Sequence, residues 1–343
     1  MIRVLVVEDS AVTREYLVAL LEEDPALEVA GTARDGLDAI EQAERLKPDV
    51  IVMDVHMPRM NGYEATSRIM EQVPTPIVIV SASSSRDETF TAFEALQAGA
   101  LVVMEKPGGP DHPDQPESTR RLVETVKLMA EVKVVRRWRK RERPAPPSPL
   151  PVRPSRKIRL IAIGASTGGP QVLAGLLAKL PGDLAAPVLI VQHIATGFTP
   201  GLVEWLSQTT CLRVKVAETG ETVRSGAVYF APPDAQMGIS TEGRIRLAKE
   251  PAEDGFCPSA SYLFQSVAQS YGGAAIGVLL TGMGRDGAAG LLQLRQAGGV
   301  TIAQDEETSV IFGMPAEAIR LGAVQHVLSP ERIAEMIRNL ATA

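Results

Sequence analysis

Three short apolar runs in the second half of the chain each lead to a polar side chain of a different chemical type. Runs of this length, bounded by glycine, are typical of buried parallel strands. The runs are 160–163, 188–191 and 274–280, and the polar residues beyond them are Ser166, His193 and Asp286. Because ligands bind at the carboxyl ends of the strands in an open α/β sheet, we expect this hydroxyl, imidazole and carboxylate to converge in one crevice.

The whole chain alternates strand and helix signals, which predicts an α/β protein with two doubly wound parallel sheets. In the first half the expected strands are 2–7, 28–32, 49–53, 76–81 and 100–104, with helical patterns such as 11–23 between them. The second half continues the alternation, and its strand-rich stretch at 212–248 predicts a small antiparallel edge.

A proline-rich stretch divides the chain. Six prolines lie between Pro144 and Pro154, which favours an extended linker, and seven basic residues precede them in 133–143. We interpret the basic residues as the solvated end of a helix, the alternative being a nucleic-acid or membrane patch. The predicted domains are 1–130 and 156–343, joined by a basic and proline-rich linker at 131–155.

Composition excludes several classes of protein. With 45% hydrophobic and 22% charged residues, the 343-residue chain can bury a core in each domain. Its net charge of −6 gives no reason to expect nucleic acid as a partner. Two cysteines cannot build a disulfide framework, and no apolar run is long enough to enter a membrane. We therefore expect a cytoplasmic protein without direct membrane insertion.

Polar side chains also follow the expected strands of the first domain. They are Glu8, Asp9, Asp54, Ser81 and Lys106. Clustered carboxylates repel one another unless a divalent cation lies among them, and oxygen ligands suit Mg²⁺. A metal-held aspartate can accept a phosphoryl group, and a hydroxyl and a lysine can bind its oxygens.

In these residues the first domain resembles a response-regulator receiver domain over about 1–125, which implies a flavodoxin-like fold. The resemblance makes Asp54 the phosphorylation site, Glu8 and Asp9 the other Mg²⁺ ligands, Ser81 the switch hydroxyl and Lys106 the phosphate-binding lysine. The family uses only the backbone carbonyl at His56, so its imidazole needs no role.

Ser166 lies in a Gly-x-Ser-x-Gly pattern between a strand and a helical segment that carries Pro170 in its first turn. Backbone N–H groups at such a helix start favour a developing oxyanion. Alternatively Ser166 only caps the helix, or the glycines bind a dinucleotide. The dinucleotide alternative is weakened because Ser166 occupies the position of the second glycine and no acid ends the next strand.

A base and an acid must accompany a serine nucleophile. Of the histidines outside the first domain, His193 ends the neighbouring strand and is favoured, whereas His326 lies within an apolar stretch. Asp286 follows a fully apolar run among glycines, and Asp305 is its rival. The order Ser–His–Asp differs from that of the α/β-hydrolases.

The second domain resembles the CheB methylesterase family across about 156–343. The matching stretches are Val191-Gln192-His193, Gly197-Phe198-Thr199, 228–233, 280–287, 298–306 and Phe312-Gly313-Met314-Pro315. The resemblance implies a Rossmann-like domain in which Ser166, His193 and Asp286 are catalytic and the backbone at Thr167 and Met283 forms the oxyanion hole.

That family implies a function and partners. The expected substrate is a glutamate methyl ester on the cytoplasmic domain of a methyl-accepting chemoreceptor, with glutamine deamidation as a second activity and no cofactor for the ester reaction. A CheA-type histidine kinase would phosphorylate Asp54, and the unphosphorylated receiver would cover the catalytic crevice. We expect a monomer. The alternative from another class is a response regulator whose second domain only binds a partner.

Two stretches depart from the family. Where relatives tend to have His-Arg-Pro-Ser-Val/Ala-Asp, this chain has Phe256-Cys257-Pro258-Ser259-Ala260-Ser261, and Gln236 replaces a histidine after the Ala-Pro-Pro block. We expect these positions to lie outside the three catalytic residues. A neutral set cannot offer the charge of His-Arg-Asp, so the departure is expected to change substrate fit.

Overall fold

The structure is a computed structural model that describes residues 1–81, 86–109, 112–113, 115–132, 157–249 and 255–341. The chain forms two compact units, Met1–Ser148 and Pro149–Ala343. The stretch expected to be a linker, 131–155, lies outside the described residues except for its first two positions. None of the helices in these described ranges has both the length and the apolarity needed to cross a bilayer.

The first unit is built on a five-stranded sheet in which all neighbours are parallel. Its strand order is β2-β1-β3-β4-β5. The strands are β1 (Ile2–Val7), β2 (Leu27–Ala33), β3 (Val50–Asp54), β4 (Ile77–Ser81) and β5 (Val102–Glu105). This is the flavodoxin-like order, whose direction changes at β1, so the expected fold class is confirmed and the carboxyl ends of β1 and β3 border a crevice.

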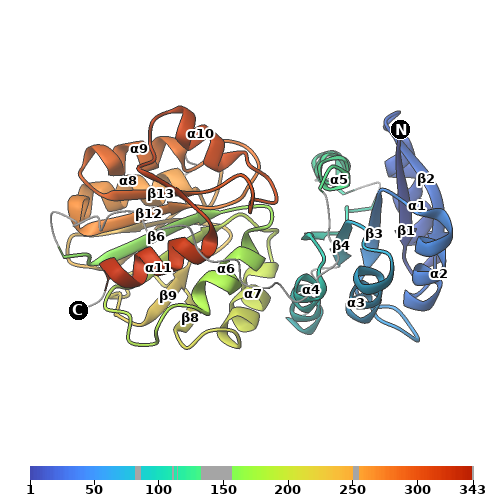
Figure 1. The fold of residues 1–343 in the computed structure, drawn as a ribbon, viewed down its shortest axis with the longest axis horizontal. Helices are drawn as coiled ribbons and strands as arrows, with labels where there is room; N and C mark the ends of the chain where they lie inside the picture. Colours follow the sequence, from blue (N-terminus) through green and yellow to red (C-terminus); the bar gives the residue numbers. More distant parts are fainter. Residues whose placement is uncertain (82–85, 110–111, 114, 133–156, 250–254, 342–343) are drawn as a thin grey trace. The chain divides into compact units, whose positions relative to one another are not determined.

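Helices cover both faces of this sheet. They are α1 (Ala11–Glu22), α2 (Gly36–Leu46), α3 (Gly62–Gln72), α4 (Arg86–Ala98) and α5 (Gln115–Ala130). α1 packs beside α5, whereas α2, α3 and α4 pack in a row, and Figure 1 shows α5 on the opposite side of the sheet from α3 and α4. Polar side chains start the helices after β1 and β2: Ser10 accepts from the Thr13 N–H, and Asp35 from those of Leu37 and Asp38.

The second unit contains a seven-stranded sheet, again with only parallel neighbours. The strands are β6 (Leu160–Ala165), β7 (Val188–Gln192), β8 (Arg213–Val216), β9 (Ala227–Phe230), β12 (Ala275–Leu279), β13 (Val300–Gln304) and β14 (His326–Leu328). Their order is β14-β13-β12-β6-β7-β9-β8. Because β6 lies between β7 and β12, the chain reverses direction across the sheet at β6, and ligand sites gather at such a point.

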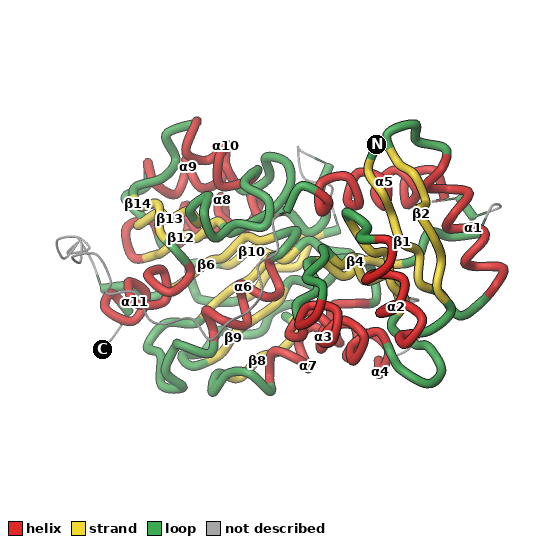
Figure 2. Tube along the Cα trace, turned by 45° about the vertical axis from the view of Figure 1, so that its right-hand side comes forward, coloured by secondary structure: helices red, strands yellow, loops and turns green. Residues whose placement is uncertain are grey.

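Two groups of helices cover this second sheet. They are α6 (Gly169–Leu177), α7 (Phe198–Ser207), α8 (Ala260–Ser270), α9 (Ala288–Gln296), α10 (Met314–Arg320) and α11 (Pro330–Leu340), with a 3₁₀ turn at Gly272–Ala274. α9 packs between α8 and α10, and α6 packs on α11. Figures 1 and 2 both show α8 and α9 on one side of β6 and α6 and α11 on the other. Phe264, Leu279 and Leu291 belong to the core between β12 and the α8–α9 layer.

The expected antiparallel element is a separate hairpin and not an edge of the large sheet. β10 (Gln236–Ile239) and β11 (Ile245–Ala248) pair only with each other, and β8 and β9 within the same stretch are parallel. Helix α8 occupies the backbone at the end of β10, because the Ser266 hydroxyl bonds both the N–H and the carbonyl of Ile239, and Ser270 donates to the same carbonyl. The hairpin is therefore attached to a helix.

Candidate active site and acidic pocket

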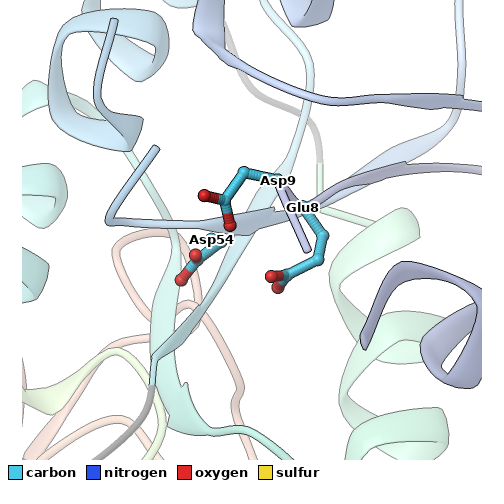
Figure 3. A group of neighbouring side chains, drawn as sticks. All are labelled: Glu8, Asp9 and Asp54. Carbon is cyan, nitrogen blue, oxygen red and sulfur yellow. The ribbon is translucent and has the colours of Figure 1, made fainter. Parts of the chain in front are cut away.

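The first unit has an acidic pocket at the carboxyl ends of β1 and β3. One carboxylate oxygen each of Glu8, Asp9 and Asp54 lies within 4.8 Å of the other two, and Figure 3 shows the three groups gathered together. Glu8 and Asp54 are buried, whereas Asp9 is exposed. The Lys106 ammonium lies 2.8 Å from Glu8 Oε2 and 3.1 Å from Asp54 Oδ1.

Burial shapes the charges in this pocket. It raises the pKa of Asp54 against the attraction of Lys106, and it raises the pKa of Glu8 against the Lys106 hydrogen bond. For Lys106 burial acts against the charge, but attraction by Asp54 and Glu8 prevails and its pKa is raised. Lys106 is thus the shared ion-pair partner of two buried carboxylates, and the carboxylate of Asp9 lies beside them. An oxygen-only set of this kind fits a hard divalent cation such as Mg²⁺.

The remaining expected residues of this domain lie beside the pocket. Ser81 ends β4 in a buried position, and its carbonyl accepts the Lys106 N–H at 3.0 Å, which ties the ends of β4 and β5 together. His56 is exposed two residues after Asp54. The structure therefore brings Glu8, Asp54 and Lys106 into direct contact, with Ser81 on the neighbouring strand end.

Ser166 lies on a tight turn between β6 and α6. The N-cap of α6 is Gly168, in the left-handed region at φ 78°, and no side chain caps this helix. Ser166 contributes only its carbonyl, which accepts the Gly169 N–H at 2.8 Å, while Pro170 occupies the first turn as expected. The hydroxyl of Ser166 is therefore not used to cap α6, and the capping alternative has no support.

The glycines of this turn make room for protein side chains. A Cβ on Gly164 would lie 2.7 Å from the Ala260 Cβ, and one on Gly168 would lie 2.6 Å from Val310. A dinucleotide site needs such glycines for close approach of a pyrophosphate. Here neighbouring side chains occupy the space, which argues against the dinucleotide alternative.

His193 and Asp286 form a hydrogen-bonded pair close to Ser166. The distance from His193 Nε2 to Asp286 Oδ2 is 2.8 Å. The N–H of His193 donates to Ala165 at 2.9 Å, and that of Ser166 donates to Thr281 at 3.0 Å, so the ends of β7, β6 and β12 are joined. Nε2 is taken by Asp286, which leaves Nδ1 for the proton of Ser166. Among the described residues no hydrogen bond joins the Ser166 hydroxyl to the imidazole.

Asp286 is buried, with 1% of its side chain exposed, in a cradle of donors at the start of α8. Its two oxygens accept from the Ser259 hydroxyl at 2.8 Å and from the N–H groups of Ala260 at 2.7 Å and Ser261 at 3.0 Å. Burial alone would raise the pKa of Asp286, but the hydrogen bond and charge of His193, with the backbone donors, hold it well below its usual range. An ionised carboxylate at this position can stabilise an imidazolium.

Segment 256–261 contains none of the three expected catalytic residues, but it is in direct contact with two of them. This segment holds Asp286, and its Phe256 ring stacks on the His193 imidazole with centroids 4.9 Å apart and planes 4° apart. Ser259 is the N-cap of α8, and a serine before a helical segment is a signal that sequence reasoning can use. N–H groups at a helix start attract a carboxylate, but the sequence did not indicate which one.

Gln192 is a second residue that sequence reasoning missed. Its buried amide donates to the carbonyls of Ser166 at 2.8 Å and His193 at 2.9 Å. One side chain thus fixes the backbone of both residues. The available signal was a polar residue inside the end of an apolar strand, because such a residue needs internal partners.

The expected oxyanion donors lie at or next to the turn that carries Ser166. Within the described part of the chain, the backbone N–H groups of Thr167 and Met283 have no acceptor. Gly282 presses against Ser166, since a Cβ there would lie 2.6 Å from the Ser166 Cβ. The Met283 backbone therefore follows a residue in contact with Ser166, where a second N–H can complement that of Thr167.

The rival base and acid lie elsewhere. His326 begins β14 at the edge of the sheet, with β13 and β12 between it and β6. Asp305 accepts from the Thr308 N–H and hydroxyl in a local turn. This placement favours His193 and Asp286 over both rivals.

Fold and site together define a response regulator with a hydrolase-type output domain. The family profile described as response regulator receiver domain matches residues 4–115, and the profile described as CheB methylesterase matches 161–337. The chain belongs to the CheB-type protein-glutamate methylesterase/protein-glutamine glutaminase family.

Relatives match over nearly the whole chain. One is protein-glutamate methylesterase/protein-glutamine glutaminase 4 of Geobacter metallireducens, which is 50% identical and matches over 99% of this chain and 99% of its own. Another is protein-glutamate methylesterase/protein-glutamine glutaminase 1 of Syntrophus aciditrophicus, which is 49% identical and matches over 99% of each chain. The crystal structure of the Thermotoga maritima CheB methylesterase catalytic domain is 38% identical, with a TM-score of 0.52, and covers 54% of this chain and 99% of its own.

Proposed function

We propose that this chain hydrolyses methyl esters of glutamate side chains on the cytoplasmic domain of a chemoreceptor and also deamidates receptor glutamines. Ser166 is the nucleophile, His193 the base and Asp286 the acid that orients it. The observation that carries this proposal is the 2.8 Å pair of His193 and Asp286 at the strand ends around Ser166. The names of the relatives support the choice of substrate.

The proposed reaction proceeds through an acyl-enzyme. Ser166 Oγ attacks the ester carbonyl while its proton passes to His193 Nδ1, and the N–H groups of Thr167 and Met283 bind the oxyanion. The C–O bond to the methoxy group breaks, and His193 returns the proton to give methanol. Water then attacks the acyl group with the same base and releases glutamate. With a glutamine substrate the leaving group is ammonia.

The first domain regulates this reaction in our proposal. Asp54 accepts a phosphoryl group from a CheA-type histidine kinase, and Mg²⁺ is held by Glu8, Asp9 and Asp54. Lys106 and Ser81 bind the phosphoryl oxygens. The regulatory domain is 1–130 and the catalytic domain 156–343, joined by a linker at 131–155. The protein works as a monomer in the cytoplasm, and the ester reaction needs no cofactor.

The direct test is release of methanol from membranes that contain a methylated chemoreceptor. Purified full-length protein is incubated with them with and without a small phosphodonor and Mg²⁺, and ammonia release from unmodified receptors is followed in parallel. Methanol release supports the proposal. Its absence, with the protein folded, would favour the non-catalytic response regulator instead.

Gly282→Ala is expected to slow methanol release roughly tenfold to a hundredfold, because catalysis depends steeply on the position of the nucleophile. The added methyl group would meet the Met314 thioether and also the Ser166 Cβ at 2.6 Å, so the backbone at 282 must shift or these neighbours must move. Gly175→Ala is the matched control, since a Cβ there meets nothing within 4 Å. Equal rates for the two variants would contradict the packing of Gly282 on the nucleophile.

Asp54→Asn is expected to abolish stimulation by the phosphodonor while leaving the basal rate within about twofold, because the amide cannot be phosphorylated but keeps its shape. The measurement is methanol release with and without phosphodonor. Asp38→Asn, on α2 of the same domain, is the control and should respond like the unaltered protein. A response that survives in Asp54→Asn would place the phosphorylation site elsewhere.

A further inference from the structure

Phe256 is an exposed aromatic residue whose ring stacks on the catalytic histidine. Its ring lies parallel to the imidazole of His193, 4° from coplanar, at a centroid distance of 4.9 Å. Yet 39% of Phe256 is exposed, so the ring is not part of the core. The imidazole side chain is only 15% exposed. An offset stack of this kind is favourable for two flat rings, and it also fixes their relative orientation.

The hydrogen bond to Asp286 cannot by itself fix the imidazole. It holds one ring atom, Nε2, and the side chain holds another, Cγ, so the plane of the ring can still tilt about the line through these two atoms. A flat surface against the ring face removes this freedom. With both restraints His193 presents Nδ1 in one direction, which is what proton transfer from Ser166 needs.

Gln236 holds the segment that carries Phe256. This residue of β10 is fully buried, and its amide N–H donates to the Phe256 carbonyl at 2.6 Å while its amide oxygen accepts the Ser259 N–H at 2.8 Å. A single side chain therefore spans the segment from the stacking residue to the helix cap. Both polar ends of the amide are used, so the position suits glutamine in particular.

These contacts form a closed ring that includes the imidazole of His193. Gln236 bonds the backbone of Phe256 and Ser259, the Ser259 hydroxyl bonds Asp286, Asp286 bonds the imidazole, and Phe256 stacks on that imidazole. The acid and the stacking ring are thus placed by one segment. Any shift of that segment moves both restraints on His193 together.

We propose that Phe256 and Gln236 are positioning residues for the catalytic base: Phe256 fixes the plane of the His193 imidazole, and Gln236 fixes Phe256 relative to the Asp286 cradle. This inference rests on the proposed function only in taking His193 as the base that activates Ser166. It is independent of which ester is the substrate.

The main readout of the test needs no receptor, and a second one uses methylated receptor. A fluorophosphonate reacts covalently with an activated serine, so its rate of labelling of Ser166 in the full-length protein reports the Ser166–His193 pair directly. Phe256→Leu keeps apolar bulk but loses the flat ring. We expect the rate of labelling to fall about tenfold to a hundredfold. With methylated receptor as substrate, kcat should fall by a similar factor while KM changes little. Phe256→Tyr keeps the ring and should label within about twofold of the unaltered protein.

Two controls separate positioning from general damage. Tyr63→Leu makes the same kind of change at an aromatic residue of the first unit that is 38% exposed, and it should label like the unaltered protein. Gln236→Met keeps the size of the side chain without its hydrogen bonds. If it acts through Phe256, the double variant Phe256→Leu/Gln236→Met is no slower than the slower single variant.

The outcomes are distinct. Labelling of Phe256→Leu at the unaltered rate, failure of Phe256→Tyr to restore the rate, or losses that multiply in the double variant would each overturn the inference. An unaltered protein that labels at Ser166 but releases no methanol would contradict the proposed substrate and leave the positioning role intact.

Discussion

Ser166→Ala is expected to lower methanol release from methylated receptor membranes by about 10⁴–10⁶-fold, the usual loss when the nucleophile of a catalytic triad is removed. Ser166 is the proposed site of the acyl-enzyme, so labelling by a fluorophosphonate should also disappear. The fold should persist. The hydroxyl does not cap α6, and the backbone bonds from Ser166 to Thr281 and from Gly169 to Ser166 do not involve it.

The control for this variant is Ser225→Ala. It removes a serine hydroxyl outside the site, one that is exposed and donates to the Ala185 carbonyl. Thermal unfolding of both variants should stay close to that of the unaltered protein. If Ser166→Ala kept more than about a hundredth of the rate, the nucleophile would have to be sought elsewhere.

The sheets could be predicted because their strands are short apolar runs that are buried along their whole length. β6, β7 and β12 begin and end within a few residues of the expected runs, since apolar character and flanking glycine are local signals.

The place of the antiparallel hairpin could not be predicted. It depends on the hydroxyls of Ser266 and Ser270, which bond Ile239 from a helix that follows later in the chain.

Some residues of the candidate site could be predicted from the sequence and others could not. Side chains at strand ends are found from the sequence, because topology alone brings those ends together. The supporting residues depend on packing between segments far apart in the chain. Ser259 signals a helix start locally, but its hydrogen bond to Asp286 joins residues 27 positions apart. The hydrogen bond from the Gln236 amide to the Phe256 carbonyl joins residues 20 positions apart. The departure of segment 256–261 from the family pattern predicted a change in substrate fit, but the sequence did not show that this segment also holds Asp286.

His193→Ala is expected to be nearly as severe as Ser166→Ala in methanol release, a loss of at least about 10⁴-fold, because the serine loses its base and the leaving group its acid. His326→Ala should stay close to the unaltered rate, since that residue lies on the edge strand β14. Residues that act as a unit are not additive, so Ser166→Ala/His193→Ala should be no slower than the slower single variant.

The loss of His193 should also change how stability depends on pH. His193 helps to hold the pKa of Asp286 below its usual range, and a depressed pKa stabilises the fold above the pKa of the unfolded aspartate and loses that effect as pH falls. His193→Ala should therefore lower the free energy of unfolding at neutral pH, with the difference shrinking below about pH 3.9. Urea unfolding at several pH values measures this. A difference that stayed undiminished well below about pH 3.9 would contradict the pairing of His193 with Asp286, and an inactive His326→Ala would contradict the choice of base.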